Sequence, residues 1–311
     1  MTELSGQPNR SSNWSRKPCD QRMTETKGLR LAAYEARRVA QTCRTFANWP
    51  SLLADMGAAR VGRGAEELTF VTRSGLHLNC PNVPGARLPL YEQFADDCYG
   101  VAWLLGRQPD RPLHVLDVGA HVGAFATHLA HAGSRLHIEC YEPSPESAKY
   151  LRRNVERNHM TGRITVHECA LAAEAGSALL DDNSAGSVHN GLVRQDHRLV
   201  EGDDAPGSRT AIVVTTSTFE QALAQSPAPF DVVKMDCEGG EYDLVYGSSP
   251  DSWNSVNRVV MEYHPVQGES WGALRSWFED VGLSVVRHVS DDPGLGTAWL
   301  SRDGDAPRGE R

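Results

Sequence analysis

A turn with two glycines follows an acid in the stretch HVLDVGAHVGAF, and this arrangement can bind a nucleotide. Asp117 lies in an apolar run, and Gly119 and Gly123 then allow the backbone to approach a ligand at the start of a helix. The dinucleotide fingerprint G-x-G-x-x-G is excluded, because His121 and Ala124 occupy its second and third glycine positions. A P-loop is also excluded, since no Lys-Ser or Lys-Thr follows the glycines.

Two acids indicate which nucleotide this turn binds. The carboxylate of Asp117 would repel a pyrophosphate but attract the ammonium group of a methionine moiety. Glu142 ends the next apolar run, where a carboxylate accepts hydrogen bonds from both ribose hydroxyls. S-adenosylmethionine satisfies both acids, so we predict it as the cofactor; the alternative is that both acids only cap helices or lie on the surface. The predicted cofactor-binding residues are Asp117, Gly119, Ala120, Gly123, Glu142, Ala170 and Asp236.

A second group of ionisable residues follows two later apolar runs. Methyl transfer needs an aligned acceptor oxygen and a base within reach of its proton. His264 has an ordinary pKa near neutrality, so we predict it as the general base, with Asp236 and Glu262 as the other catalytic residues. Its net pKa shift cannot be read from the sequence, because burial and a neighbouring carboxylate act in opposite directions. The group consists of Asp236, Glu238, Glu241, Glu262 and His264.

Other roles for this group stay open. Asp236 could itself be the base, and Glu238 and Glu241 flank a helix start, where acids favourably meet the helix dipole. Asp236 and Glu262 could hold Mg²⁺, but the sequence offers no obvious third ligand, so no metal is predicted. Lys234 lies within the preceding strand and is expected to pair with one of the acids.

Four segments of the chain match the pattern of a known family. They are LDVGAHVGAF, YEPSPESAKYLRRNV, VVKMDCEGGEYDLV and VVMEYHP, and the most specific part is KMDCEGGEY, residues 234–242. With these segments the chain resembles the FkbM family of S-adenosylmethionine-dependent methyltransferases between about Tyr91 and Leu300. The resemblance implies a doubly wound sheet with a final antiparallel strand, and methylation of hydroxyl groups on polyketides, sugars or related secondary metabolites. His121 departs from the family pattern, in which a small polar residue is commoner.

The spacing of apolar residues predicts the elements that position these groups. Short apolar runs alternate with helical patterns, which indicates a mostly parallel, Rossmann-like α/β sheet with helices on both faces and an antiparallel C-terminal strand. Two closing strands, LSVVRHV and GTAWLSR, form the last pair. The predicted strands are 113–118, 136–141, 163–168, 211–216, 231–236 and 256–262, and the predicted helices are 123–132, 144–158, 218–224, 240–247 and 270–281.

The remaining segments are expected to surround this domain. Pro50 is expected to divide the first helical run into two helices, a hairpin is predicted around Ser74-Gly75, and one helix from about 90 to 106. The predicted divisions are a disordered arm at 1–27, an N-terminal cap of helices and a hairpin at 28–108, a class I methyltransferase domain at 109–302 with a lid loop at 172–210, and a disordered tail at 303–311.

The amino-acid composition limits the kinds of partner that the protein is expected to bind. A net charge of −9 gives no broad basic surface, so nucleic acid is not expected. Seven scattered cysteines without CxxC predict neither a disulfide framework nor a zinc site, which favours the cytoplasm. The sequence contains no run of about eighteen apolar residues, so no membrane span is predicted.

Together, the motifs and the composition predict an O-methyltransferase with a small-molecule hydroxyl acceptor. N-methylation and a non-catalytic nucleotide-binding module are the alternatives, and self-association stays open.

Overall fold

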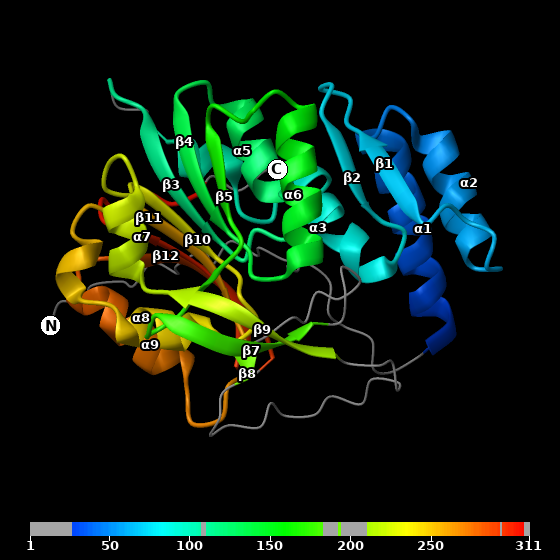
Figure 1. The fold of residues 1–311 in the computed structure, drawn as a ribbon. Coiled ribbons are helices and arrows are strands. Elements are labelled where there is room, and N and C mark those ends of the chain that lie inside the picture. Colours follow the sequence, from blue (N-terminus) through cyan, green and yellow to red (C-terminus); the bar gives the residue numbers. More distant parts are fainter. Residues whose placement is uncertain (1–26, 107–109, 183–191, 194–209, 293, 308–311) are drawn as a thin grey trace, which may run out of the picture.

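A seven-stranded sheet forms the centre of the computed structural model, which describes residues 27–106, 110–182, 192–193, 210–292 and 294–307 (Figure 1). The strand order is β12-β13-β11-β10-β3-β4-β5. The five strands from β11 to β5 run parallel, and β13 is antiparallel between β11 and β12. This confirms the predicted doubly wound fold. The strands are β3 (Leu113–Val118), β4 (Leu136–Tyr141), β5 (Ile164–His167), β10 (Val232–Met235), β11 (Arg258–Tyr263), β12 (Ser284–Asp292) and β13 (Leu295–Ser301).

Helices cover both faces of this sheet. Neighbouring residues of β3 illustrate this, because Val115 packs into one hydrophobic cluster with α5 and α6, and Leu116 into another with α7, α8 and α9. Such double coverage explains why β3 reads as a nearly continuous apolar run, in which all six residues are buried. The helices are α5 (Ala124–Ala132), α6 (Pro145–Arg157), α7 (Phe219–Gln225), α8 (Glu241–Gly247) and α9 (Trp271–Asp280), with a short 3₁₀ helix at Pro250–Trp253.

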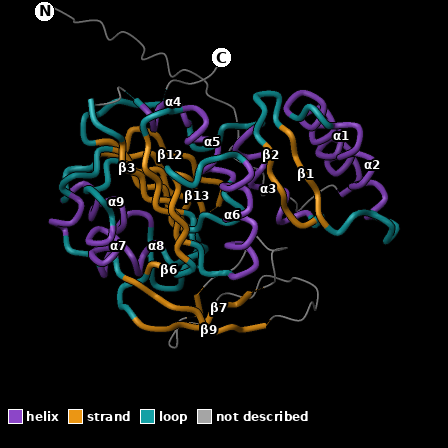
Figure 2. The backbone as a smooth tube through the Cα atoms, turned by 45° about the horizontal axis from the view of Figure 1, so that its top comes forward, coloured by secondary structure: helices purple, strands orange, loops and turns teal. Residues whose placement is uncertain are grey.

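The N-terminal part packs beside α5 and α6 (Figures 1 and 2). Pro50 lies in the first turn of α2, as expected for a break between two helices, and the predicted hairpin is present. The prediction of one helix at 90–106 is wrong. Asp97 and Gly100 adopt positive φ angles of 44° and 73°, which end one helix and begin another. The elements are α1 (Lys27–Thr45), α2 (Trp49–Ala59), β1 (Glu67–Val71), β2 (His77–Pro81), α3 (Pro84–Phe94) and α4 (Val101–Leu105).

A second sheet occupies part of the segment that was expected to be a loop. Its order is β6-β9-β7-β8, and β7 pairs with β9 in antiparallel register along its whole length. The expected irregular loop at 172–210 is therefore corrected, and the strand predicted at 211–216 belongs to this second sheet. Residues 183–191 and 194–209 lie outside the described residues. The strands are β6 (Ala170–Leu171), β7 (Gly176–Asp182), β8 (Leu192–Val193) and β9 (Thr210–Ser217).

The second sheet begins at the edge of the main sheet where the parallel strands end. Ala170 opens β6 shortly after β5 ends at His167. Figures 1 and 2 show β7 and β9 as a ribbon that projects from the body of the molecule on this side. The ribbon therefore lies at the edge where doubly wound sheets bind their ligands.

The segment after β13 differs from the expected disordered tail. The carboxylates of Asp303 and Asp305 lie 3.5 and 3.3 Å from the guanidinium of Arg258, and the indole N–H of Trp103 donates to the carbonyl of Asp305 at 2.9 Å. Residues 303–307 are thus held against α4 and β11. The last four residues, like the predicted arm up to residue 26, lie outside the described part; Lys27 already belongs to α1.

Two further expectations concern cysteines and membranes. Cys98 is disulfide-bonded, which the scattered cysteine pattern did not predict. Among the described residues, the free cysteines are Cys43, Cys80, Cys140, Cys169 and Cys237. Among the residues that the structure describes, no helix combines the length and the apolar character needed to cross a membrane.

Candidate active site

The turn after β3 lies directly against the backbone after β10. Gly119 has a φ of 75°, and a Cβ at this position would overlap the carbonyl oxygen of Asp236. Gly123 has a φ of 83°, and a Cβ there would overlap the side chain of Leu151 on α6. Both positions therefore require glycine. The chain reverses its direction of winding between β3 and β10, which is where a doubly wound sheet binds nucleotides.

Glu142 joins the end of β4 to the same turn. One carboxylate oxygen accepts a hydrogen bond from the backbone N–H of His121 at 2.7 Å, and the other accepts from the N–H of Ser144 at 2.9 Å. Burial raises the pKa of Glu142 to about 7, although these two hydrogen bonds oppose the shift. Each carboxylate oxygen has a second lone pair, so the residue can hold the turn and still accept from two ligand hydroxyls. The capping and ribose-binding interpretations are therefore compatible.

Asp117 is enclosed beneath the turn. Its side chain is completely buried, and Oδ1 lies 3.1 Å from the ammonium nitrogen of Lys234 on the neighbouring strand β10. Lys234 also donates to the carbonyl of Gly119 at 2.7 Å. Burial raises the pKa of Asp117, and Lys234 opposes this shift. The expected pairing of Lys234 is thus confirmed. Lys234 pairs with one carboxylate oxygen of Asp117. The contact of Asp117 with the ammonium group of the cofactor stays a prediction.

The two predicted alanines also lie at strand ends. Ala120 is buried in the turn, and its N–H donates to the carbonyl of Tyr141 at 3.2 Å. Ala170 is buried at the start of β6 and pairs with Thr216 of β9. Both positions border the edge that carries the turn and Glu142.

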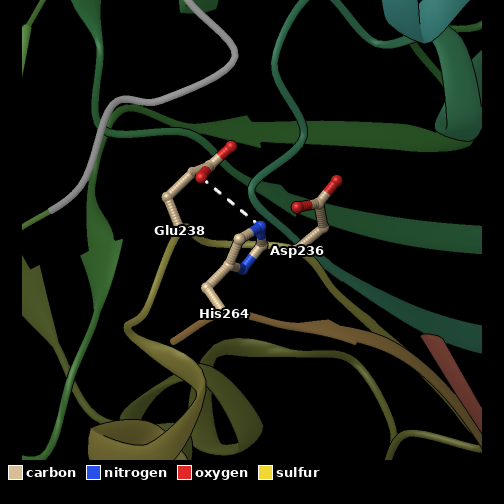
Figure 3. A group of neighbouring side chains, drawn as sticks. All are labelled: Asp236, Glu238 and His264. Atoms are coloured by element: carbon tan, nitrogen blue, oxygen red, sulfur yellow. Dashed lines mark ion pairs between the residues drawn. The ribbon is translucent and has the colours of Figure 1, made fainter. Parts of the chain in front are cut away.

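A fully buried carboxylate fixes the ring of His264. Oε1 of Glu241 lies 3.1 Å from Nδ1 of His264, and the same carboxylate accepts from the N–H groups of Cys237 and Gly239 at 2.9 Å. The other ring nitrogen, Nε2, lies 3.4 Å from Oε2 of Glu238 (Figure 3). Oε1 of Glu262 is 3.8 Å from the same nitrogen. The structure thus brings the whole predicted group together.

These carboxylates determine the charge of His264. Burial lowers the pKa of His264, but Glu238 and Glu241, with a smaller contribution from Glu262, raise it well above its ordinary value. These carboxylates therefore favour the protonated imidazole over the neutral one. This arrangement does not favour His264 as the general base. The pKa of Glu262 is also raised well above its usual range, by burial and by the charge of Asp236.

Two residues of the N-terminal part complete the site, and sequence reasoning missed both. The hydroxyl of Tyr99 donates to Oδ2 of Asp236 at 2.8 Å. Glu92 on α3 has a pKa of about 8, raised by burial and by the charge of Asp236. No local sequence signal marks these residues, because each acts across more than 130 positions of the chain.

Three donor atoms of the site suit a cation. One atom each from Asp236, Glu238 and His264 lies within 4.8 Å of the others. The sequence suggested the pair Asp236 and Glu262 and offered no third ligand. In this set, Glu238 and His264 join Asp236 in place of Glu262.

Comparison with known proteins gives the family. The methyltransferase FkbM domain matches residues 117–285, more than half of the chain. The 31-O-demethyl-FK506 methyltransferase FkbM of Streptomyces tacrolimicus is 27% identical over 235 residues, which cover 68% of this chain and 86% of that protein. Methyltransferase sdnD of Sordaria araneosa is 24% identical over 216 residues, which cover 63% and 81%.

A solved SAM-dependent methyltransferase from Agrobacterium tumefaciens has 9% sequence identity and a TM-score of 0.44, with 76% of this chain and 71% of that chain covered. The family match extends over the glycine turn, Glu142 and the group around His264. S-adenosylmethionine is accordingly the cofactor, as the turn and its two acids predict. The chain belongs to the methyltransferase FkbM family.

Proposed function

We propose that this methyltransferase transfers its methyl group to a hydroxyl oxygen of a small molecule. The observation that supports this proposal most directly is the close approach of Gly119 to Asp236, which joins the nucleotide turn to the group around His264. A relative from Streptomyces tacrolimicus is named for methylation of an oxygen of FK506, which supports an oxygen acceptor here. The net charge of −9 makes a nucleic-acid acceptor unfavourable.

Each part of the site has a role in this reaction. Bound S-adenosylmethionine supplies an electrophilic methyl group on its sulfonium. The turn from Gly119 to Gly123 and the carboxylate of Glu142 hold the nucleoside and methionine parts in place. Asp236 and its neighbours bind the acceptor hydroxyl in line with the methyl group, and such alignment alone contributes several kcal/mol.

The acceptor hydroxyl must also lose its proton. As the new C–O bond forms, the C–S bond breaks and its electron pair returns to sulfur, while the hydroxyl proton passes to a carboxylate. We assign the proton to Asp236 or Glu262 and not to His264, because the carboxylates around His264 favour its protonated form. His264 then orients these carboxylates and balances their charge.

The acceptor should enter over the carboxyl edge of the sheet. Tyr99 contacts Asp236 from the N-terminal side, and the ribbon of β7 and β9 borders the same edge. We propose that these two parts of the chain surround the acceptor, and that the ribbon has the role of the lid that the sequence analysis predicted at 172–210.

Transfer of a labelled methyl group tests this function. The protein is incubated with methyl-labelled S-adenosylmethionine and matched pairs of acceptors that differ only in a hydroxyl or an amine, drawn from macrolides, other polyketides and sugars. We expect methyl ethers from the hydroxyl members. Label on nitrogen would instead support N-methylation, and saturable cofactor binding without any transfer would support a nucleotide-binding module.

A further inference from the structure

Three potential metal ligands converge at the carboxyl ends of β10 and β11. Asp236 and Glu238 lie in the loop after β10, and His264 follows β11, with one donor atom of each within 4.8 Å of the others. Opposite ligands of a cation bound at about 2.1–2.4 Å lie roughly 4.2–4.8 Å apart. The three atoms can therefore surround one ion, which would take the place of a proton on Nε2 of His264.

We propose that Asp236, Glu238 and His264 bind one divalent cation of the Mn²⁺ or Mg²⁺ class. Two carboxylates and one imidazole favour Mn²⁺, because carboxylates suit both ions and imidazole suits the softer transition metals. The sequence analysis predicted no metal, since it found no third ligand beside Asp236 and Glu262. Figure 3 shows that Glu238 and His264 point toward one another next to Asp236 and supply the missing positions.

Groups outside this set orient two of its members. Glu241 is completely buried and holds Nδ1 of His264, so that Nε2 faces Glu238. Tyr99 donates to Oδ2 of Asp236 and leaves the other oxygen for a ligand. Metal-binding histidines usually donate their second ring N–H to a carboxylate, and metal-binding carboxylates are themselves hydrogen-bonded.

A separate observation points to a ligand beside this set. Both ring nitrogens of His121 are buried and have no hydrogen-bond partner in the described structure. Burial lowers the pKa of His121 to about 4, and Asp236 is the charge that most strongly opposes this shift. The ring is therefore neutral, and it belongs to the turn in which Gly119 approaches the carbonyl of Asp236. Buried polar atoms without a partner need one, and water bound to a cation at Asp236 would supply it.

The cation would also assist the proposed reaction, and this part of the inference rests on the proposed function. A divalent cation that binds the acceptor oxygen favours loss of the hydroxyl proton. Glu262 lies 3.8 Å from Nε2 of His264 and is not one of the three ligands, so it is placed to take that proton. Oxygen then forms its bond to the methyl carbon as the C–S bond breaks.

Direct titration with Mn²⁺ tests the site without any turnover. The full chain is treated with EDTA, dialysed, and titrated with MnCl₂, and free Mn²⁺ is followed by electron paramagnetic resonance. We expect one saturable site per chain, and at least about tenfold weaker binding in Glu238→Gln and Asp236→Asn, as for loss of a ligand. Glu279→Gln is the control, because Glu279 pairs with Arg275 on α9 away from the site.

Urea unfolding of each variant shows that it remains folded. Absence of a saturable site in the wild type, or unchanged affinity in both ligand variants, would overturn the proposal. Its failure is distinguishable from failure of the proposed function. If methyl ethers still form in EDTA and no Mn²⁺ site is found, the cation proposal is wrong and the proposed function stands. If Mn²⁺ binds at a saturable site but label is transferred only to nitrogen, the hydroxyl acceptor is wrong and the cation site stands.

Discussion

The carboxylate of Glu142 holds the backbone N–H of His121, so the end of β4 is tied to the glycine turn after β3. The same turn contacts the backbone at Asp236 after β10. Three strand ends thus meet at one point, and each contributes a residue that the sequence assigned to the cofactor. Substitutions at each strand end should therefore affect cofactor binding or turnover in separable ways.

Gly119→Ala should weaken the turn. Alanine at a φ of 75° costs about 1–2 kcal/mol, and its Cβ overlaps the carbonyl of Asp236, so we expect both lower stability and lower affinity for S-adenosylhomocysteine. Gly162→Ala is the matched control, since nothing lies within 4 Å of a Cβ there. Urea unfolding and calorimetry measure the two effects. Equal behaviour of the two variants would show that the close approach is unimportant.

Glu142 should make cofactor binding depend on pH. The ionised carboxylate accepts from ribose hydroxyls, and its pKa is about 7. Affinity for S-adenosylhomocysteine should therefore be full above pH 8 and fall as the pH drops below 7, by up to about tenfold per unit. Glu142→Gln should bind about 1.5–3 kcal/mol more weakly at pH 8 and lose this pH dependence. A flat profile in the wild type between pH 5.5 and 8 would exclude the role of Glu142.

Lys234→Met should destabilise the protein strongly. The substitution leaves Asp117 buried without its partner, which costs about 3–5 kcal/mol in comparable buried pairs. The double variant Asp117→Asn/Lys234→Met should recover much of this loss, because it removes the uncompensated charge. Urea unfolding of both variants gives the difference. A single variant as stable as the wild type would contradict the importance of this pair for folding.

Tyr99→Phe should lower turnover without abolishing it. The change removes the hydrogen bond to Asp236 but keeps the aromatic ring, so we expect a kcat reduced by about tenfold, in line with loss of one hydrogen bond. Affinity for S-adenosylhomocysteine should stay the same, because Tyr99 contacts the acceptor side of the site. An altered cofactor affinity with normal kcat would place Tyr99 in the cofactor pocket.

The parts of the fold that could be predicted from the sequence are those with strong local patterns of apolar residues. The predicted bounds 113–118 and 136–141 coincide with β3 and β4, since these apolar runs are buried on both faces. The glycine turn and Glu142 were also predicted from local signals, which are the spacing of the glycines and the position of an acid at the end of an apolar run. The second sheet was missed because Leu179 and Leu180 of β7 stand in a polar stretch, and only pairing with the distant β9 makes them a strand.

The site was only partly predictable for a different reason. Sequence reasoning grouped Asp236, Glu262 and His264 from their positions at strand ends, and the structure brings them together. It could not give the direction of the His264 pKa shift, which depends on how closely Glu238 and Glu241 approach in space. It also missed Tyr99, which lies 137 positions from Asp236.

The central claim is that the group around His264 performs methyl transfer beside a separately formed cofactor pocket. The most direct measurement is kcat and the dissociation constant of S-adenosylhomocysteine, determined side by side for the wild type and His264→Ala. We predict a kcat lower by at least roughly tenfold, as for loss of a group that orients the catalytic carboxylates or binds the proposed cation, and a cofactor affinity changed by less than about twofold. Near-normal turnover in His264→Ala, or equal losses in turnover and cofactor affinity, would contradict the claim.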